Sequence, residues 1–155
     1  MHWFTRWWPA LAWAVVISAL STSSFSAENT GRIIIPILHW AFPHAALATL
    51  FEIHHVLRKS AHFTEYFILS VLILRGIRGQ SRETHLRWAL LAILIVAGYA
   101  SLDELHQAFV PGRTAAFTDV LLDTTGGVAA QIVAALFALR ISARDRRQES
   151  VETSA

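Results

Sequence analysis

The sequence lacks cysteine altogether and is poor in charge. With no cysteine among its 155 residues, disulfide bonds, thiolate nucleophiles and zinc–thiolate sites are excluded. Charged residues make up only 15% of the chain, whereas an average soluble domain has about 25%. Apolar residues reach 54%, and the mean hydropathy is +0.45. This composition predicts a chain exposed to lipid, and its length allows one domain.

The chain also carries little net charge, formally +2 at neutral pH. Its basic residues lie mostly in short connections and near the C-terminus, a placement that membrane topology explains better than nucleic-acid binding does. We therefore expect membrane lipids, and no nucleic acid, among its partners. The sequence contains no motif specific for a metal or a cofactor, and neither is expected.

Four apolar segments predict four transmembrane helices, at residues 7–25, 60–74, 88–102 and 119–139. The second is short for about 30 Å of hydrocarbon, so its polar first turns must reach the headgroups or line a wet cleft. The first has a rival interpretation as a cleaved signal peptide, because it ends in small residues near Ser24 and Ser26.

The segment between the first two spans is mixed in character. From Ala45 to Lys59, apolar residues such as Leu47, Leu50 and Phe51 recur at helical spacing. This pattern predicts an interfacial helix on the bilayer surface, with a re-entrant hairpin as the alternative. The expected fold is therefore all-α: a compact bundle of four transmembrane helices plus this interfacial or re-entrant helix. Residues 1–148 form a single membrane domain, and residues 149–155 are expected to be a disordered cytoplasmic tail.

The basic residues predict the orientation. In a four-span arrangement one side of the membrane carries nine of the thirteen: Arg6, Arg75, Arg78, Arg82, Arg87, Arg140, Arg144, Arg146 and Arg147. The other side carries four: Arg32, Arg58, Lys59 and Arg113. Because cytoplasmic loops are enriched in Lys and Arg, the first side is expected to be cytoplasmic. The protein is then expected in the bacterial cytoplasmic membrane, with both termini in the cytoplasm.

With this topology, polar residues of three separate segments gather at the extracytoplasmic face. They are His62, Glu65 and Tyr66 at the start of the second span, Asp103, Glu104 and Gln107 at the end of the third, and Arg113, Asp119 and Asp123 around the start of the fourth. Ionisable residues within spans are costly and are usually paired or functional. We therefore expect these residues to form one polar site.

Spacing supports a common site. His62, Glu65 and Tyr66 stand at i, i+3 and i+4, and Asp119 and Asp123 at i and i+4, so each set shares one helical face. The site has three interpretations from the residues alone. It is a network of hydrogen bonds that staples short helices, a metal site built from nitrogen and oxygen ligands, or a site for an anion gripped by Arg113.

Three ordered motifs carry a family resemblance: RKSAHFTEY at residues 58–66, DELHQAFVPGR at 103–113 and DVLLDTTG at 119–126. Through them the chain resembles the VanZ-like family of bacterial membrane proteins, from about Ser21 to Leu139. The family positions matched are Lys59, His62, Glu65, Tyr66, Asp103, Glu104, Gln107, Pro111, Gly112, Arg113, Asp119 and Gly126. Position 123 is often Asn in the family and is Asp here, which adds a potential negative charge.

The family is named for a protein that gives low-level resistance to the glycopeptide teicoplanin. The resemblance thus implies a cell-envelope role linked to glycopeptide resistance, but no particular reaction. We expect the site to bind or act on an anionic lipid-linked or peptidoglycan-related group. The alternative is a non-catalytic accessory protein whose polar cluster is structural or docks another envelope protein.

Roles for the site residues follow from their chemistry. The candidates for proton transfer are His62, Glu65, Asp103 and Glu104, with His62 paired to Glu65 or Asp103, because a neighbouring carboxylate tunes an imidazole near neutral pH. Arg113 with Lys59 is expected to hold the anion. The remaining ligand-binding candidates are Tyr66, Gln107, Asp119 and Asp123. Whether the protein is an enzyme stays open.

The orientation can be tested with reporter fusions. Fusions after Gly79 and after Ser142 are expected to report a cytoplasmic position, and a fusion after Thr114 an extracytoplasmic one, because of the bias in basic residues. A cytoplasmic signal at Thr114 would contradict both the topology and the placement of the polar site.

Overall fold

The computed structural model of the chain describes residues 2–79, 81, 85–113 and 115–152. In this part of the chain every regular element is helical: α1 (His2–Leu20), η1 (Ser23–Phe25), α2 (Ala27–Ala41), α3 (Leu47–Arg78), α4 (Leu86–Gln107) and α5 (Phe117–Glu152). The all-α prediction is therefore confirmed. Arg82, Thr114 and residues 153–155 of the expected tail lie outside the described residues.

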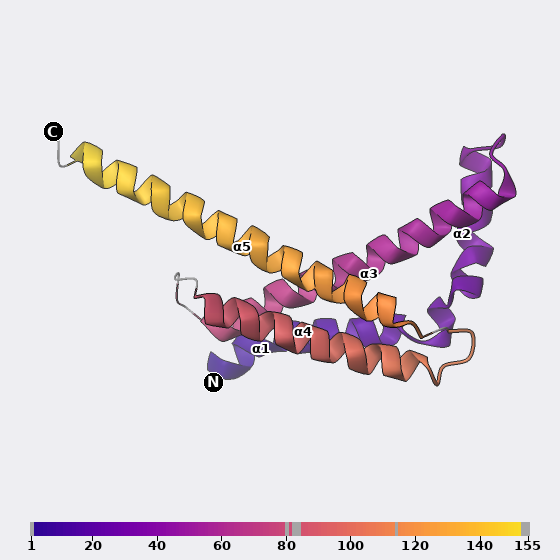
Figure 1. Cartoon of the computed structure of the whole chain (residues 1–155), viewed down its shortest axis with the longest axis horizontal. Coiled ribbons are helices and arrows are strands. Elements are labelled where there is room, and N and C mark those ends of the chain that lie inside the picture. The colour runs from indigo at the N-terminus through magenta and orange to yellow at the C-terminus, as the bar shows by residue number, and fades with distance from the viewer. Residues whose placement is uncertain (1, 80, 82–84, 114, 153–155) are drawn as a thin grey trace.

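The first helix ends earlier than the sequence predicted, at Leu20 instead of residue 25. Hydroxyl side chains beyond Leu20 compete for backbone groups: Thr22 Oγ1 donates to the carbonyl of Ala19 at 2.8 Å, and Ser26 Oγ accepts from Asn29 N at the start of α2. The chain consequently bends by 71° between α1 and the η1–α2 segment. In Figure 1, α2 stands away from the end of α1.

The prediction of a separate interfacial helix at residues 45–59 is wrong. Residues 47–78 form one continuous helix, α3, that includes both this segment and the predicted second span. The sequence offers no break, since the first glycine of α3 is Gly76 and it contains no proline. Gly79, at φ +61°, then ends the helix in a left-handed conformation.

The last helix also exceeds its predicted length. α5 continues to Glu152 instead of ending near residue 139, because residues 140–152 contain neither glycine nor proline. Residues 149–152 are thus helical where the sequence predicted disorder. Figure 1 shows the C-terminal half of α5 extending away from the other helices, and α2 with the N-terminal part of α3 extending in another direction, so the bundle is less compact than expected.

Two helices of the described chain, α4 and α5, are long and apolar enough to cross a membrane. The bent pair of α1 with η1–α2 makes a third if the pair is counted as one span. α3 is not among them, because charged and polar residues interrupt its sequence. The four-span arrangement stays a prediction.

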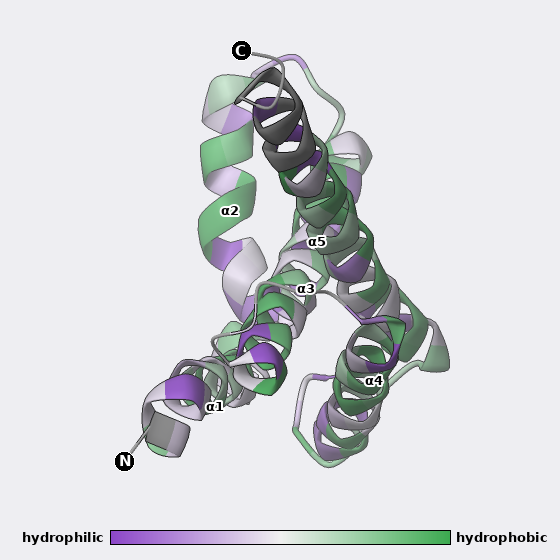
Figure 2. Ribbon diagram, turned by 90° about the vertical axis from the view of Figure 1, so that its left-hand side faces the viewer, coloured by the Kyte–Doolittle hydropathy of each residue, from purple (hydrophilic) through white to green (hydrophobic). Residues whose placement is uncertain are grey.

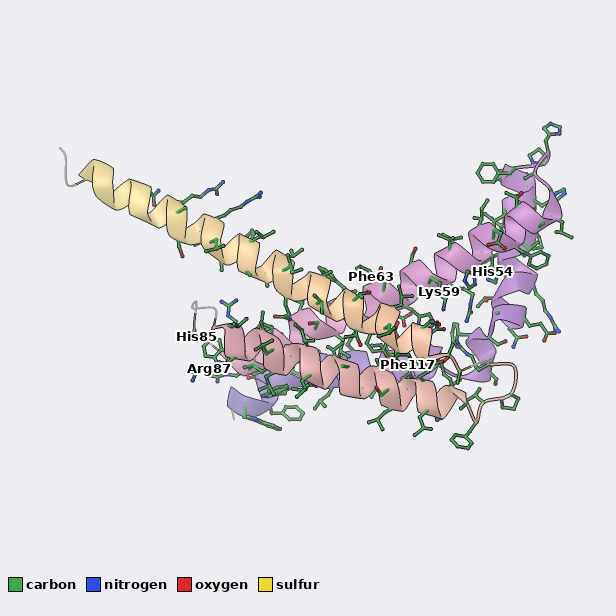
Figure 3. The ribbon with its side chains drawn as sticks, viewed as in Figure 1. His54, Lys59, Phe63, His85, Arg87 and Phe117 are labelled. Atoms are coloured by element: carbon green, nitrogen blue, oxygen red, sulfur yellow. The ribbon has the colours of Figure 1, made fainter. Side chains whose placement is uncertain are left out.

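The helices pack around α3, which contacts α1, α2, α4 and α5. Tyr66 and Ile73 of α3 form a buried core with Ile17 of α1 and Val96 of α4. The helices are apolar over much of their length, as the green segments of Figure 2 show. Large apolar side chains such as Leu94, Leu136 and Phe137 are exposed, as lipid contact requires. In Figure 3, Lys59 and Phe117 lie toward one end of the bundle, and His85 and Arg87 lie at the opposite end.

A buried histidine joins α2 to α3. The ring of His54 is 5% exposed, and its Nε2 lies 3.1 Å from Thr30 Oγ1. Burial lowers the pKa of His54, and the positive charge of Arg58 adds to this effect, so the imidazole is neutral near pH 7. His54 thus lies between α2 and α3.

A glycine allows α3 and α5 to approach closely. A Cβ atom at Gly126 would lie 2.4 Å from the carbonyl oxygen of Phe63, which belongs to the backbone of the facing helix and cannot rotate away. Small residues permit such contacts between membrane helices. The separation of α3 and α5 therefore depends on the absence of a side chain at this position.

Gly126→Ala is expected to push α3 and α5 apart and to lower the free energy of unfolding by about 1–3 kcal/mol, as overpacking does. Thermal unfolding in detergent measures the change. Gly98→Ala is the matched control, because a Cβ atom there meets nothing within 4 Å and alanine favours helix by about 1 kcal/mol. Equal effects of the two substitutions would contradict the close contact.

Candidate functional site

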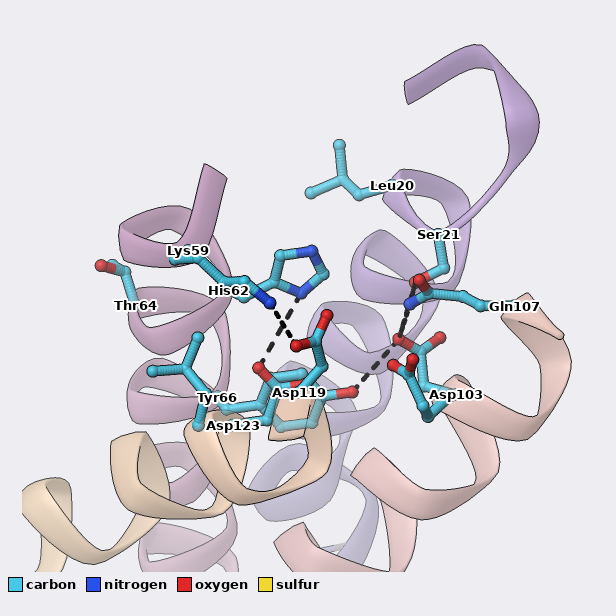
Figure 4. A network of polar contacts seen from close by, with 12 residues as sticks. Leu20, Ser21, Lys59, His62, Thr64, Tyr66, Asp103, Gln107, Asp119 and Asp123 are labelled. Carbon is cyan, nitrogen blue, oxygen red and sulfur yellow. Dashed lines mark hydrogen bonds and ion pairs between the residues drawn. The ribbon is translucent and has the colours of Figure 1, made fainter. Parts of the chain in front are cut away.

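The structure brings the polar residues of the three predicted segments together at one end of the bundle. Figure 4 shows side chains from α3, the end of α4 and the start of α5 facing one another, together with the end of α1. These side chains thus lie close together, and their position at the extracytoplasmic face stays a prediction. The structure adds which residues are paired.

Lys59 of α3 forms an ion pair with Asp119 of α5. The side chains are 33% and 21% exposed, so the pair is only partly accessible to water. Screening is weaker there than at an open surface, where such pairs contribute little. The pair connects the start of α5 to α3.

Asp103 is the most heavily bonded carboxylate of the cluster. Its Oδ2 accepts hydrogen bonds from Ser21 Oγ at 2.7 Å, from Gln107 Nε2 at 2.9 Å and from Tyr66 OH at 3.3 Å. The donors come from the end of α1, from α4 itself and from α3. Asp103 is 6% exposed, so these three bonds replace the water it would otherwise bind.

His62 faces Asp123, across the same α3–α5 interface. Its Nδ1 lies 3.8 Å from Asp123 Oδ1, too far for a hydrogen bond, and both atoms are buried without a hydrogen-bond partner. The sequence predicted Glu65 or Asp103 as the partner of His62; the carboxylate that faces its Nδ1 is instead Asp123. This is the position where the chain departs from the family's usual Asn.

Glu104 supports the start of α5. Its Oε1 accepts a hydrogen bond of 2.5 Å from the backbone nitrogen of Ala116, just before the first residue of α5. A carboxylate at a helix N-terminus is stabilised by the helix dipole and by the free N–H groups there. The structure thus gives Glu104 a role in positioning a helix.

Arg113 binds the end of α1 and not a carboxylate. Its Nη2 donates to the carbonyls of Leu20 and Thr22, the latter at 3.1 Å, and its Nε donates to Thr22 at 3.4 Å. Free carbonyls and the negative dipole end of a helix attract such a cation. Burial lowers the pKa of Arg113, but a guanidinium keeps its charge at neutral pH.

Arg58 is a site residue that our sequence-based list of candidates omitted. Its Nη1 donates to the carbonyl of Phe25 at 2.9 Å and to Thr30 Oγ1 at 3.2 Å. Burial lowers its pKa, while the carboxylates of Asp119 and Glu65 raise it. The sequence could have assigned Arg58 to the site, because Arg58 and His62 stand at i and i+4 and therefore share one face of a helix.

A cavity of about 190 Å³ opens beside these residues. Arg58, His62, Glu65 and Arg113 line it together with apolar side chains. Among the described residues no hydrogen bond engages the carboxylate of Glu65, Nη2 of Arg58 or Nη1 of Arg113. These groups are available to a ligand.

A second cavity, of about 250 Å³, adjoins the first. Its lining is mostly polar: Ala27, His55, Arg58, Lys59, His62, Gln107, Gly112, Arg113 and Asp119. Five of these residues, Lys59, His62, Gln107, Arg113 and Asp119, were predicted to belong to the site. Tyr66 and Asp123 are instead fully buried and line neither cavity.

Within the described residues no group of three or more histidine and carboxylate side chains could hold a metal ion. The chemistry available at the site is therefore the recognition of charge by guanidinium and ammonium groups, with His62 and Glu65 as titratable groups beside them.

The fold and this polar site define a helical membrane protein whose functional candidates gather at one end of the bundle. Residues 6–138 match the model of the VanZ/LLP1 family. The match covers most of the chain, which therefore belongs to the VanZ/LLP1 family, as the motifs predicted. Searches among curated proteins and among solved structures found no match.

Removing Asp103 is expected to destabilise the bundle more than removing one of its donors. Asp103→Ala leaves Ser21, Gln107 and Tyr66 without their shared acceptor, and we expect the free energy of unfolding to fall by about 3 kcal/mol or more. Tyr66→Phe removes one long hydrogen bond and is expected to cost about 1 kcal/mol. Thermal unfolding in detergent measures both.

The control for this comparison is His106→Ala, an exposed position in the same turn of α4. It is expected to leave the unfolding temperature nearly unchanged. If Asp103→Ala were no more damaging than His106→Ala, the hydrogen bonds to Asp103 would not hold α1, α3 and α4 together.

Proposed function

We propose that this protein binds an anionic lipid-linked or peptidoglycan-related group at the extracytoplasmic face of the bacterial cytoplasmic membrane. One observation carries the proposal: Arg58 and Arg113 line the same two cavities, and each has at least one guanidinium nitrogen free of hydrogen bonds within the described chain. Guanidinium groups bind phosphates and carboxylates through paired N–H donors.

The proposed topology has four spans and both termini in the cytoplasm. In it α3 provides the second span: at 1.5 Å per residue its 32 residues extend roughly 48 Å, enough to cross the bilayer while its first turns remain outside. The basic residues at the opposite end of the bundle support this orientation. A link to teicoplanin resistance rests on membership of the family.

His62 is the best candidate for proton transfer within this site. His62 lines both cavities. In contrast, Asp103 already accepts hydrogen bonds from three donors, and Glu104 accepts one from the backbone nitrogen of Ala116 at the start of α5. Glu65, which lines the first cavity with His62, has a carboxylate that is not engaged in a hydrogen bond. A reaction, if the site performs one, would use these two groups as acid and base.

The second candidate function is that of a non-catalytic accessory protein. The hydrogen bonds of Asp103, Glu104 and Arg113 favour it, because each ties one helix to another. His62→Ala separates the two functions when protein level is measured beside teicoplanin susceptibility. If His62 belongs to a functional site, His62→Ala abolishes the phenotype while the protein level stays normal. If His62 is structural, His62→Ala lowers the protein level and the phenotype together.

The anion site can be tested by substituting Arg58. Binding of undecaprenyl phosphate and of its uncharged alcohol is measured on the purified protein in phosphatidylcholine nanodiscs. The phosphate is expected to bind, and Arg58→Gln to weaken it by about tenfold, the loss of one charge-assisted hydrogen bond. The alcohol should show no such dependence.

Arg75→Gln is the matched control, because it removes the same charge from an exposed position at the other end of α3. It is expected to bind the phosphate as the unchanged protein does. The proposal fails if Arg58→Gln and Arg75→Gln bind equally well, or if the alcohol binds as tightly as the phosphate.

A further inference from the structure

The two cavities at the candidate site share one wall. Arg58, His62 and Arg113 line both the cavity of about 190 Å³ and the cavity of about 250 Å³. Each alone is smaller than a typical ligand pocket of about 300–1,000 Å³. A ligand that extends past the shared wall would occupy both cavities. The polarity of the residues that line each cavity therefore indicates the chemical class of that ligand.

The first cavity is mostly apolar away from the shared wall. Its apolar side chains come from the end of α1, from η1, from α2 and from α3: Leu20, Phe25, Ile34, Leu57 and Ala61. Thr30 and Glu65 are the polar residues that line it besides those of the shared wall. Phe25 and Leu57 are 44% and 48% exposed, so the cavity opens to its surroundings. Its volume exceeds the ~150 Å³ that accommodates benzene in an apolar cavity, so it has room for the first units of one hydrocarbon chain.

The first cavity also lies beside an apolar surface. On α2, Ile33 and Ile37 are 67% and 58% exposed and flank the lining residue Ile34. In a membrane protein such residues contact lipid. An apolar surface therefore continues from this cavity along α2, and the rest of a hydrocarbon chain can lie against it.

The second cavity has the opposite character. Of the carboxylates only Asp119 lines it, and Asp119 is already paired with Lys59. The charges left over are those of Arg58 and Arg113. Burial and the positive charge of Arg58 lower the pKa of Arg113, whereas the carboxylates of Asp103, Glu65 and Glu104 raise it. An anion between Arg58 and Arg113 would offset the repulsion between these two cations.

We propose that the two cavities form one bipartite site for a single-chain lipid phosphate. The hydrocarbon chain lies in the first cavity, the phosphate lies between Arg58 and Arg113, and any further polar head group extends into the second cavity. The inference rests on the proposed function and adds to it the class of ligand and the placement of its parts.

The observations favour one chain over two. Of the two cavities that the cationic wall separates in the described part of the chain, one is mostly apolar, and its volume suits the first few units of one chain. A two-chain phospholipid would leave its second chain against the polar residues of the other cavity. A free phosphate compound would leave the apolar cavity unused.

The test uses farnesyl diphosphate, a single-chain lipid phosphate, and inorganic diphosphate, which has the same anion without a chain. Both are titrated onto the full chain in phosphatidylcholine nanodiscs. Farnesyl diphosphate is expected to bind at least about tenfold more tightly. Ala61→Trp, which fills the first cavity from α3, is expected to weaken farnesyl diphosphate by about tenfold and to leave inorganic diphosphate unchanged.

Ala48→Trp is the control for the added ring, since Ala48 is exposed on the same helix and lines neither cavity. A second variant keeps the test independent of the folding of the first. Ile34→Asn places a polar group in the first cavity from α2, and Ile132→Asn, at an exposed isoleucine of α5 that lines neither cavity, is the control. Both controls are expected to bind farnesyl diphosphate as the unchanged protein does.

The ligand class is overturned if Ala61→Trp and Ile34→Asn bind farnesyl diphosphate like their controls, or if they weaken both ligands alike. It is also overturned if phosphatidylglycerol, which has two chains, displaces farnesyl diphosphate as well as undecaprenyl phosphate does. Failure of the anion site has a different signature: chain-dependent binding persists, but Arg58→Gln does not change it.

Discussion

The buried carboxylate of Asp103 is the constraint on which the arrangement of the helices depends. A carboxylate that is 6% exposed needs donors to replace water, and Asp103 obtains them from the end of α1, from α3 and from its own helix. Because the donors belong to segments far apart in sequence, satisfying this one group sets the positions of three helices relative to one another. The Lys59–Asp119 pair then connects α5 to the same end.

The polar groups of the cluster have two roles with different consequences. Asp103 and Glu104 form hydrogen bonds that connect helices, so they maintain the shape of the site. His62 and Glu65 line open space. Arg58 and Arg113 do both, because each binds a backbone carbonyl and also lines the cavities. A site of this kind combines a rigid frame with a few free charges, which is how binding sites achieve specificity for an anion at low cost in reorganisation.

The bend after α1 creates the space that the free groups line. Because α2 leaves α1 at 71°, a cavity remains where the end of α1 meets η1, α2 and α3. Arg113 and Arg58 occupy this junction by binding the carbonyls of Leu20 and Phe25. Two cations held at helix ends are thereby exposed to a cavity that is apolar on one side and polar on the other.

The sequence by itself determined that the chain is helical and apolar, that its polar residues gather at one end, and that it belongs to the family its motifs resemble. These properties follow from composition and from spacing within a helix, which are local. Only the tertiary structure decided the pairings: His62 faces Asp123 and not Glu65, and Arg113 binds α1 and not a carboxylate. Such choices depend on how far α3, α4 and α5 approach, and that distance is set by contacts such as Gly126 against Phe63. The same holds for the cavities, because helical spacing shows which residues share a face but not which faces remain uncovered once the helices have packed.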